Sequence, residues 1–349
     1  MTPIVSLLAC LLAAEPTPGA GELSTIVRVE RGRYLMGTLC TAEAEGADTT
    51  EVAAALGAAL DEMARLERVT SNWDSVSDVS SLNQLSGDSY ACSPDLFAVL
   101  DSALVLARLT GGAFDPTIEP LTRVWDLRGA GRVPHPDSLE AARSLVGWQT
   151  MELERPTRTT RLAVRGAGVD LGGIGKGFAL ARAAGVLQAR GIRRARLNLG
   201  GEVLVLSEGR PWTVTIAHPA RRLEPALSLE LANGAISTSG QSERGFERAG
   251  VRYGHVLDPA SGRPVMTAAS VTVIGPSATR TDAISTALLV MGRERAGQFA
   301  RLHPELGVLW LEPVANEVRA WKWNWDVATA VPAANVKWID TPNTRTSPR

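Results

Sequence analysis

Residues 168–177 read Gly-Val-Asp-Leu-Gly-Gly-Ile-Gly-Lys-Gly, and they constrain the fold more than any other part of the chain. Glycines at this density let the backbone approach a ligand or another element closely, and they leave amide N–H groups free to face anionic oxygens. Residues 178–190 then follow a helical pattern that stops at Gly191. Because a helix N-terminus carries partial positive charge, this glycine-rich turn would stabilise a phosphate at residues 173–177.

Two common phosphate-binding motifs do not fit this turn. A P-loop requires Ser or Thr after its lysine, whereas Lys176 is followed by Gly177, which has no hydroxyl for Mg²⁺. A dinucleotide-binding fingerprint requires a third glycine where Leu180 stands. A ligand site of another kind and a tight strand-to-helix turn without a ligand both stay open at this point.

Composition limits the function without selecting it. With 349 residues, 45% of them hydrophobic, the chain can bury one large core or two smaller ones. The net charge is −1, and lysines and arginines are dispersed, which argues against nucleic acid and anionic membrane surfaces as partners. No segment approaches the ~20 apolar residues that span a bilayer.

Short apolar segments alternate with helical patterns along the chain. We predict strands over residues 25–38, 212–216, 227–231 and 270–274, helices over 51–69 and 96–109, and a surface loop over 129–136. The mixture indicates the α+β class with antiparallel pairing rather than a regular βαβ array. The first helix places five apolar side chains on one face: Val52, Leu56, Leu60, Met63 and Leu66.

The N-terminus predicts export. An apolar run over residues 4–14 precedes a loose linker, and Leu-Leu-Ala-Cys at residues 7–10 resembles a bacterial lipobox, in which Cys10 is lipidated. Since no Lys or Arg precedes the run, cleavage after Ala14 without lipidation is an alternative. We expect a periplasmic protein, with a membrane lipid anchor at Cys10 if the lipobox is used. Only Cys40 and Cys92 then remain, too few for a disulfide framework.

Four further segments accompany the glycine-rich turn: residues 35–38 (Leu-Met-Gly-Thr), 110–117 (Thr-Gly-Gly-Ala-Phe-Asp-Pro-Thr), 236–240 (Ile-Ser-Thr-Ser-Gly) with 254–262 (Gly-His-Val-Leu-Asp-Pro-Ala-Ser-Gly), and 281–286 (Thr-Asp-Ala-Ile-Ser-Thr). In this order the set closely resembles the ApbE family of FAD:protein FMN transferases, from about Arg33 to about Gly292. The resemblance implies a compact α+β fold of mixed sheets and packed helices, T-fold-like in architecture. It would occupy residues 25–312, after an export signal and linker over 1–21.

The resemblance also implies an activity. Members transfer FMN from FAD, with Mg²⁺, to a Thr or Ser hydroxyl of a membrane-bound or periplasmic redox protein, and release AMP. Three alternatives stay open: a periplasmic FAD pyrophosphatase that uses water instead of the hydroxyl, a flavin-binding lipoprotein without chemistry, and an exported structural lipoprotein.

Asp282 and Thr286 form the metal hypothesis. Four residues apart on a predicted helix, they present a carboxylate and a hydroxyl on one face, which suits Mg²⁺. The alternative is an Asp that favours the helix dipole and a Thr bonded to its own backbone. In the family this pair ligates the metal together with a backbone carbonyl that falls on Gly173.

The resemblance assigns flavin contacts to Met36, Trp73, Ala113, Phe114, Asp115, Asp170, Lys176 and Val256. Trp73 stands where the family usually has Tyr, so stacking is kept and a hydroxyl is lost. Lys176 suits a pyrophosphate, and Asp115 reads equally well as part of an ordinary turn. The chain departs from the family at Ala181, where Asp is usual, and at Glu202, where Asp is common.

His255, in the segment Tyr-Gly-His-Val-Leu-Asp-Pro at residues 253–259, is the candidate general base. Its imidazole can take the proton of an attacking hydroxyl at neutral pH. The alternatives are a histidine bonded within a turn that Asp258 orients, and a base supplied by Asp282 or a metal-bound water.

The C-terminal segment, residues 313–349, falls beyond the resemblance. Residues 318–325 are predicted to form a strand with Trp321, Trp323 and Trp325 on one face. That face would cover a sheet edge or bind a partner. We expect residues 341–349 to be disordered.

Overall fold

The computed structural model describes residues 26–325 and 330–339. Its centre is a nine-stranded sheet in the order β1-β2-β6-β7-β10-β15-β16-β17-β19, antiparallel except between the last two strands. The predicted α+β class with antiparallel pairing is confirmed. The strands are β1 (Val27–Leu35), β2 (Thr38–Gly46), β6 (Arg194–Leu199), β7 (Glu202–Leu206), β10 (Gly234–Gly240), β15 (Ser270–Gly275), β16 (Gly307–Val314), β17 (Glu317–Trp323) and β19 (Val336–Trp338).

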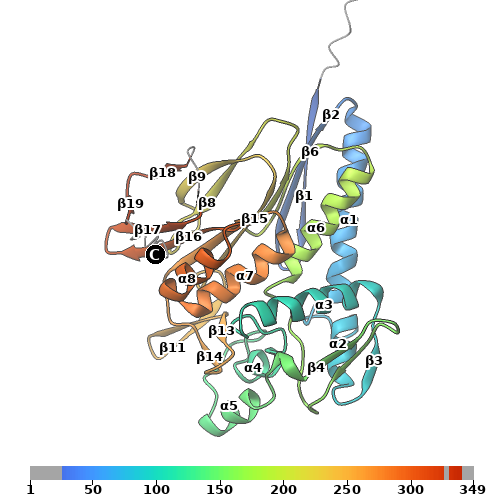
Figure 1. Ribbon diagram of the computed structural model, residues 1–349, viewed down its shortest axis with the longest axis vertical. Coiled ribbons are helices and arrows are strands. Elements are labelled where there is room, and N and C mark those ends of the chain that lie inside the picture. Colours follow the sequence, from blue (N-terminus) through green and yellow to red (C-terminus); the bar gives the residue numbers. More distant parts are fainter. Residues whose placement is uncertain (1–25, 326–329, 340–349) are drawn as a thin grey trace, which may run out of the picture.

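Helices cover one face of this sheet. Figure 1 shows α1 (Thr49–Thr70), α6 (Gly175–Ala189) and α7 (Ala278–Met291) side by side across it, with α8 (Arg293–Leu302) following α7. The helix predicted over residues 51–69 is confirmed as α1, because its five apolar side chains are at most 2% exposed in the main core. The helix predicted after the glycine-rich turn is α6, which begins within that turn at Gly175.

A second core lies on the opposite face of the sheet. There β8 (Trp212–Ala217), β9 (Pro225–Leu231) and β18 (Val331–Pro332) form a small sheet in the order β18-β9-β8. Its apolar side chains, including Trp212 and Leu229, pack against Val203, Leu309 and Leu311 of the central sheet. The central sheet is therefore buried on both faces, and the hydrophobic side chains of the chain are divided between two cores.

The remaining elements gather at the lower end of Figure 1, beyond the start of α6. They support the loops that surround the glycine-rich turn. They are α2 (Asp78–Gln84), β3 (Ser89–Ala91), α3 (Pro94–Leu109), α4 (Glu119–Val124), α5 (Pro136–Arg143), a 3₁₀ turn (Trp148–Thr150), β4 (Met151–Glu154), β5 (Thr159–Leu162), β11 (Gly245–Arg248), β12 (Val251–Gly254), β13 (Leu257–Asp258) and β14 (Arg263–Pro264).

The strand predicted over residues 25–38 was too long. β1 ends at Leu35, and β2 starts at Thr38. Met36 and Gly37 between them both have positive φ, 51° and 75°, as a two-residue hairpin turn of right-handed twist requires. Met36 therefore lies at a hairpin tip rather than within a strand.

The prediction of three tryptophans on one strand face was wrong for Trp325. β17 ends at Trp323, and Asn324 has a φ of 50°, a left-handed conformation that ends the alternation of faces. Trp321 and Trp323 pack against the main core, whereas Trp325 is buried in the second core. The strand does cover the edge of β16, and β19 pairs in turn with its outer side.

The domain boundary predicted at residue 313 falls inside β16, and β17 pairs with β16 along its full length. Residues 313–323 are thus part of the central sheet. The export signal over 1–21, Cys10 and the tail over 341–349 lie outside the described residues. Cys40 and Cys92 are both buried and free.

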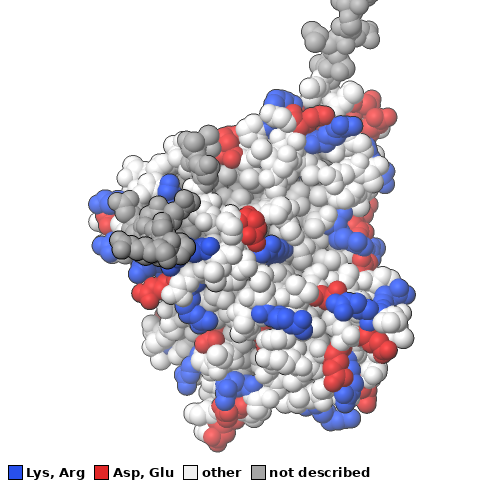
Figure 2. Space-filling view, viewed as in Figure 1, with Lys and Arg blue, Asp and Glu red and all other residues white. Residues whose placement is uncertain are grey.

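The described surface carries charges of both signs. Figure 2 shows lysines and arginines interspersed with acidic residues on the face in view. Within residues 26–325 and 330–339, no helix has the length and apolar character to cross a membrane.

Candidate functional site

The glycine-rich turn joins the lower loops to α6. Asp170 N–H donates to Pro116 O at 2.8 Å, which fixes the turn against the segment that follows Phe114. The Asp170 carboxylate accepts from Gly172 N–H at 2.9 Å and thereby tightens the turn. The predicted Asp170 side chain therefore shapes the turn itself.

Two glycines in the turn are needed because α7 lies very close. A Cβ added at Gly177 would clash with the carbonyl of Ala278 and lie 2.7 Å from Asp282 Cβ. A Cβ at Gly173 would lie 3.1 Å from Thr286 Oγ1 and 3.3 Å from a ring carbon of Phe114. The turn can pack onto α7 only without these side chains.

Two of the predicted metal ligands, Asp282 and Thr286, lie on α7 at this contact. Asp282, 2% exposed, accepts a hydrogen bond from Gly177 N–H through Oδ2 at 2.7 Å. Thr286 lies one helical turn further on, against Gly173, and its Oγ1 is 3.3 Å from Ser239 Oγ. The confirmed helix α7 thus presents a carboxylate and a hydroxyl to the turn, as the spacing predicted.

The donor set fits a hard divalent cation. Burial raises the pKa of Asp282, although Lys176 and the Gly177 N–H oppose the rise. A divalent cation beside Asp282 would compensate the charge of this buried carboxylate. No group of three or more His, Cys, Asp or Glu suited to a metal occurs among the described residues.

Lys176 extends from the first turn of α6 to Glu202, with Nζ 2.6 Å from Oε2. Burial lowers the pKa of Lys176, but the carboxylates of Glu202, Asp282 and Glu243 outweigh it and raise that pKa overall. Burial raises the pKa of Glu202, and Lys176 opposes the rise. The site therefore carries an excess of acidic groups around one ammonium.

His255 follows β12 and is half-buried. Its Nδ1 lies 3.3 Å from the carbonyl oxygen of Arg244. Since a carbonyl only accepts, Nδ1 carries the proton and Nε2 is the unprotonated nitrogen. Burial lowers the pKa of His255, which Glu243 opposes in part, and the lowered pKa favours the neutral imidazole. The geometry suits a general base acting through Nε2.

Sequence reasoning missed the segment 241–244, which follows β10 directly. The Gln241 amide donates to the carbonyls of Val256 and Val265, each at 2.8 Å, and accepts from Val256 N–H at 3.0 Å. Arg244 donates to Gly37 O at 3.2 Å, and its guanidinium lies 5.9 Å from the Trp73 ring centre. The segment therefore joins the His255 loop to the β1–β2 hairpin. In the sequence, only its position next to the motif at 236–240 could have indicated that it belongs to the site.

The predicted flavin contacts lie around the same turn. Met36 reaches it from the hairpin, with Cε 3.4 Å from a Cβ placed on Gly175. Trp73 is 62% exposed, which leaves its ring open to a ligand, whereas Phe114 is buried beside Gly173. Ala113 is half-buried and packs against the main core.

The Asp115 side chain and the Val256 backbone both form hydrogen bonds within the protein. The Asp115 carboxylate accepts from Thr117 N–H and Oγ1, at 2.8 and 2.6 Å, and from Trp148 N–H at 3.0 Å. Burial raises its pKa, and these three bonds oppose the rise. The side chain organises the turn that carries Phe114.

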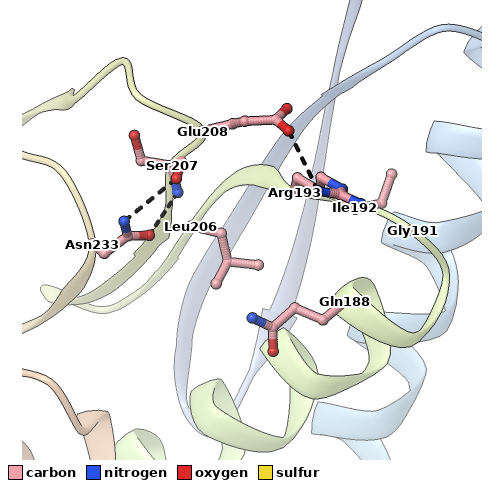
Figure 3. A pocket seen from close by; sticks show the side chains of 8 residues that line it. All are labelled: Gln188, Gly191, Ile192, Arg193, Leu206, Ser207, Glu208 and Asn233. Carbon is pink, nitrogen blue, oxygen red and sulfur yellow. Dashed lines mark hydrogen bonds and ion pairs between the residues drawn. The ribbon is translucent and has the colours of Figure 1, made fainter.

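A surface hollow of about 420 Å³ lies at the other end of α6 (Figure 3). Its walls include the Arg193–Glu208 ion pair at 3.6 Å, and Asn233 bonded to Ser207. α6 has 15 residues, so the hollow is about 20 Å from the glycine-rich turn. None of the predicted site residues lines it, and it is separate from the site.

The comparisons with known proteins agree with this geometry. A family model described as the ApbE family matches residues 36–310. The chain belongs to the ApbE family. It is 30% identical over 331 residues to the FAD:protein FMN transferase of Treponema pallidum, which covers 88% of this chain and 91% of that protein.

Solved structures are similar over most of the chain. The ApbE protein of Thermotoga maritima has a TM-score of 0.76 at 28% identity and covers 81% of this chain and 94% of its own. The apo flavinyl transferase ApbE of Pseudomonas stutzeri has the same TM-score and identity, and covers 86% and 96%. The predicted family and fold are confirmed.

A substitution at Gly173 tests whether this turn is a cation site. Gly173→Val adds a branched side chain where Thr286 Oγ1 and Phe114 already lie within 3.3 Å of a Cβ. We expect the rise in thermal unfolding midpoint on titration with MgCl₂ to disappear. Gly185→Ala is the matched control in α6, because a Cβ there meets nothing within 4 Å. An unchanged Mg²⁺ response in Gly173→Val would make the turn purely structural.

Proposed function

We propose that the protein transfers FMN from FAD to a Ser or Thr hydroxyl of another protein and releases AMP. The observation that carries this proposal is the convergence of the glycine-rich turn on α7, which brings Gly173, Lys176, Asp282 and Thr286 together at one helix N-terminus. Relatives named FAD:protein FMN transferase support it. A membrane-bound or periplasmic redox protein is the proposed acceptor.

The chain's own residues would carry out the transfer as follows. Lys176 and the N-terminus of α6 neutralise and orient the diphosphate of FAD. The acceptor hydroxyl oxygen attacks the phosphorus on the FMN side, and the bond from that phosphorus to the AMP oxygen breaks. His255 Nε2 takes the hydroxyl proton, while its Nδ1–H stays bonded to Arg244 O. FMN then remains on the acceptor through a phosphoester.

We further propose that Asp282, Thr286 and the Gly173 carbonyl hold Mg²⁺. When bound, Mg²⁺ supplies positive charge to the diphosphate as charge builds up on the leaving group. The support is the donor set described above and the excess of acidic groups around Lys176.

Incubation with FAD, Mg²⁺ and a candidate acceptor flavoprotein tests the proposed activity. Flavin fluorescence on a denaturing gel reports covalent FMN, and chromatography reports AMP. AMP and free FMN without labelled acceptor would favour an FAD pyrophosphatase. Flavin retention without AMP would favour a carrier, and no retention at all would leave a structural lipoprotein.

Asp282 provides a test of the metal requirement. It is buried, so removing it also leaves the Gly177 N–H without its acceptor, at a cost of about 1–3 kcal/mol in stability. Asp282→Asn keeps an acceptor oxygen and removes the charge. We expect Mg²⁺-dependent AMP release to be lost in both Asp282→Asn and Asp282→Ala, measured by chromatography.

Asp95→Ala is the control for this test, because Asp95 is a buried carboxylate of α3, ion-paired to Arg182 at 2.5 Å. AMP release should persist in that variant. Full activity of Asp282→Asn with normal Mg²⁺ dependence would remove Asp282 from the site.

His255→Ala separates transfer from hydrolysis. The variant should still bind FAD, while transfer falls ~10²–10⁴-fold, the usual contribution of one positioned base. Because the pKa of His255 is lowered below its ordinary 6.5, the neutral base persists above that lowered pKa. Wild-type transfer should therefore decline only as pH falls through it, and this acid limb should be absent in the variant. Equal losses in FAD affinity and transfer would make His255 a binding residue.

We also propose that the protein is exported to the periplasm and lipid-anchored at Cys10, on the support of the apolar run and the Leu-Leu-Ala-Cys segment. Cys10→Ser should move the protein from the membrane to the soluble periplasmic fraction, measured by fractionation and immunoblotting. Equal membrane association of both forms would exclude a lipid anchor at Cys10, and cytoplasmic wild-type protein would exclude export.

A further inference from the structure

The ion pair between Lys176 and Glu202 is almost enclosed. The side chain of Glu202 is 4% exposed and that of Lys176 is 20% exposed. Lys176 is the second residue of α6, and Glu202 is the first residue of β7. The pair therefore joins the helix start, where the diphosphate would bind, to the central sheet beneath it.

The β6–β7 turn delivers Glu202 to this position. Gly200 and Gly201 have φ of 67° and 102°, and the Asn198 side chain accepts from Gly201 N–H at 3.0 Å. Leu199 and Glu202 pair across the turn, so β7 begins with the glutamate already in register. A tight glycine turn thus fixes the backbone from which the carboxylate reaches Lys176.

Lysine at this place needs such a partner. Burial disfavours an ammonium ion, and its four-carbon stem gives the unpaired side chain many rotamers. Asp282 and Glu243 favour the charged form electrostatically, but Glu202 is the group that accepts a hydrogen bond from Nζ. Of the three N–H donors on Nζ, one goes to Glu202, and the described residues show no partner for the other two.

We propose that Glu202 is a positioning residue, which holds the Lys176 ammonium beside the start of α6 so that its two remaining N–H bonds meet the diphosphate of FAD. This inference rests on the proposed function. Glu202 does not touch the flavin nucleotide itself and acts through Lys176.

Equilibrium binding of FAD tests the inference without turnover. The dissociation constant is measured by flavin fluorescence with MgCl₂ for the wild type, Glu202→Ala, Glu202→Gln, Lys176→Met and the double variant Lys176→Met/Glu202→Gln. Glu202→Ala and Lys176→Met should each raise it about 10- to 100-fold, the size of one charged hydrogen bond. Glu202→Gln should raise it less, because the amide oxygen still accepts from Nζ.

The double variant distinguishes positioning from a general structural role. If Glu202 acts through Lys176, Glu202→Gln should change the dissociation constant less than twofold once Lys176 is Met. Glu45→Ala is the matched control, because Glu45 is a glutamate of β2 whose side chain is 9% exposed, with Arg194 at 3.1 Å. It should lower the thermal unfolding midpoint and leave FAD affinity unchanged.

Three results would overturn the inference. One is wild-type affinity in folded Glu202→Ala, or in Glu202→Gln if the alanine variant does not fold. Another is a double variant whose FAD dissociation constant rises by the product of the two single-variant increases. The third is a wild type that binds no FAD, which refutes the proposed function as well and is thereby distinguishable from the other two.

Discussion

The hydrogen bond from Gly177 N–H to the Asp282 carboxylate joins the starts of α6 and α7, and the rest of the site depends on it. It forms only because Gly177 has no side chain to separate the helices. The same approach brings Gly173 against Thr286 and places Lys176 over the start of β7. A buried acid that would be costly alone is thus hydrogen-bonded to the helix start and lies near the Lys176 ammonium.

The features predicted well from the sequence are those whose determinants lie close together in the chain. The apolar face of α1 repeats with the helical period, so Leu56 and Met63 were placed in the core. The spacing of Asp282 and Thr286 likewise places both on one face of α7. The motif order supplied the remaining site residues, since no local rule points to Met36 or Trp73.

The features that were missed depend on partners far away in the chain or on single backbone angles. Glu202 stood out only as a departure from a family pattern, and its partner is 26 residues away. Gln241 and Arg244 look like ordinary loop residues until the fold brings Val256 and Gly37 to them. Trp325 was misplaced because the left-handed Asn324 interrupts the alternation on which the prediction relied.

The Arg244–Gly37 contact joins residues 207 positions apart, and the Gly177–Asp282 bond joins residues 105 apart. A ribosome synthesises the chain from its N-terminus, and a domain folds as a unit once its long-range partners exist. The glycine-rich turn is therefore synthesised well before α7, the helix against which it packs. The two sides of the site can therefore meet only after α7 has been synthesised, whichever segment folds first.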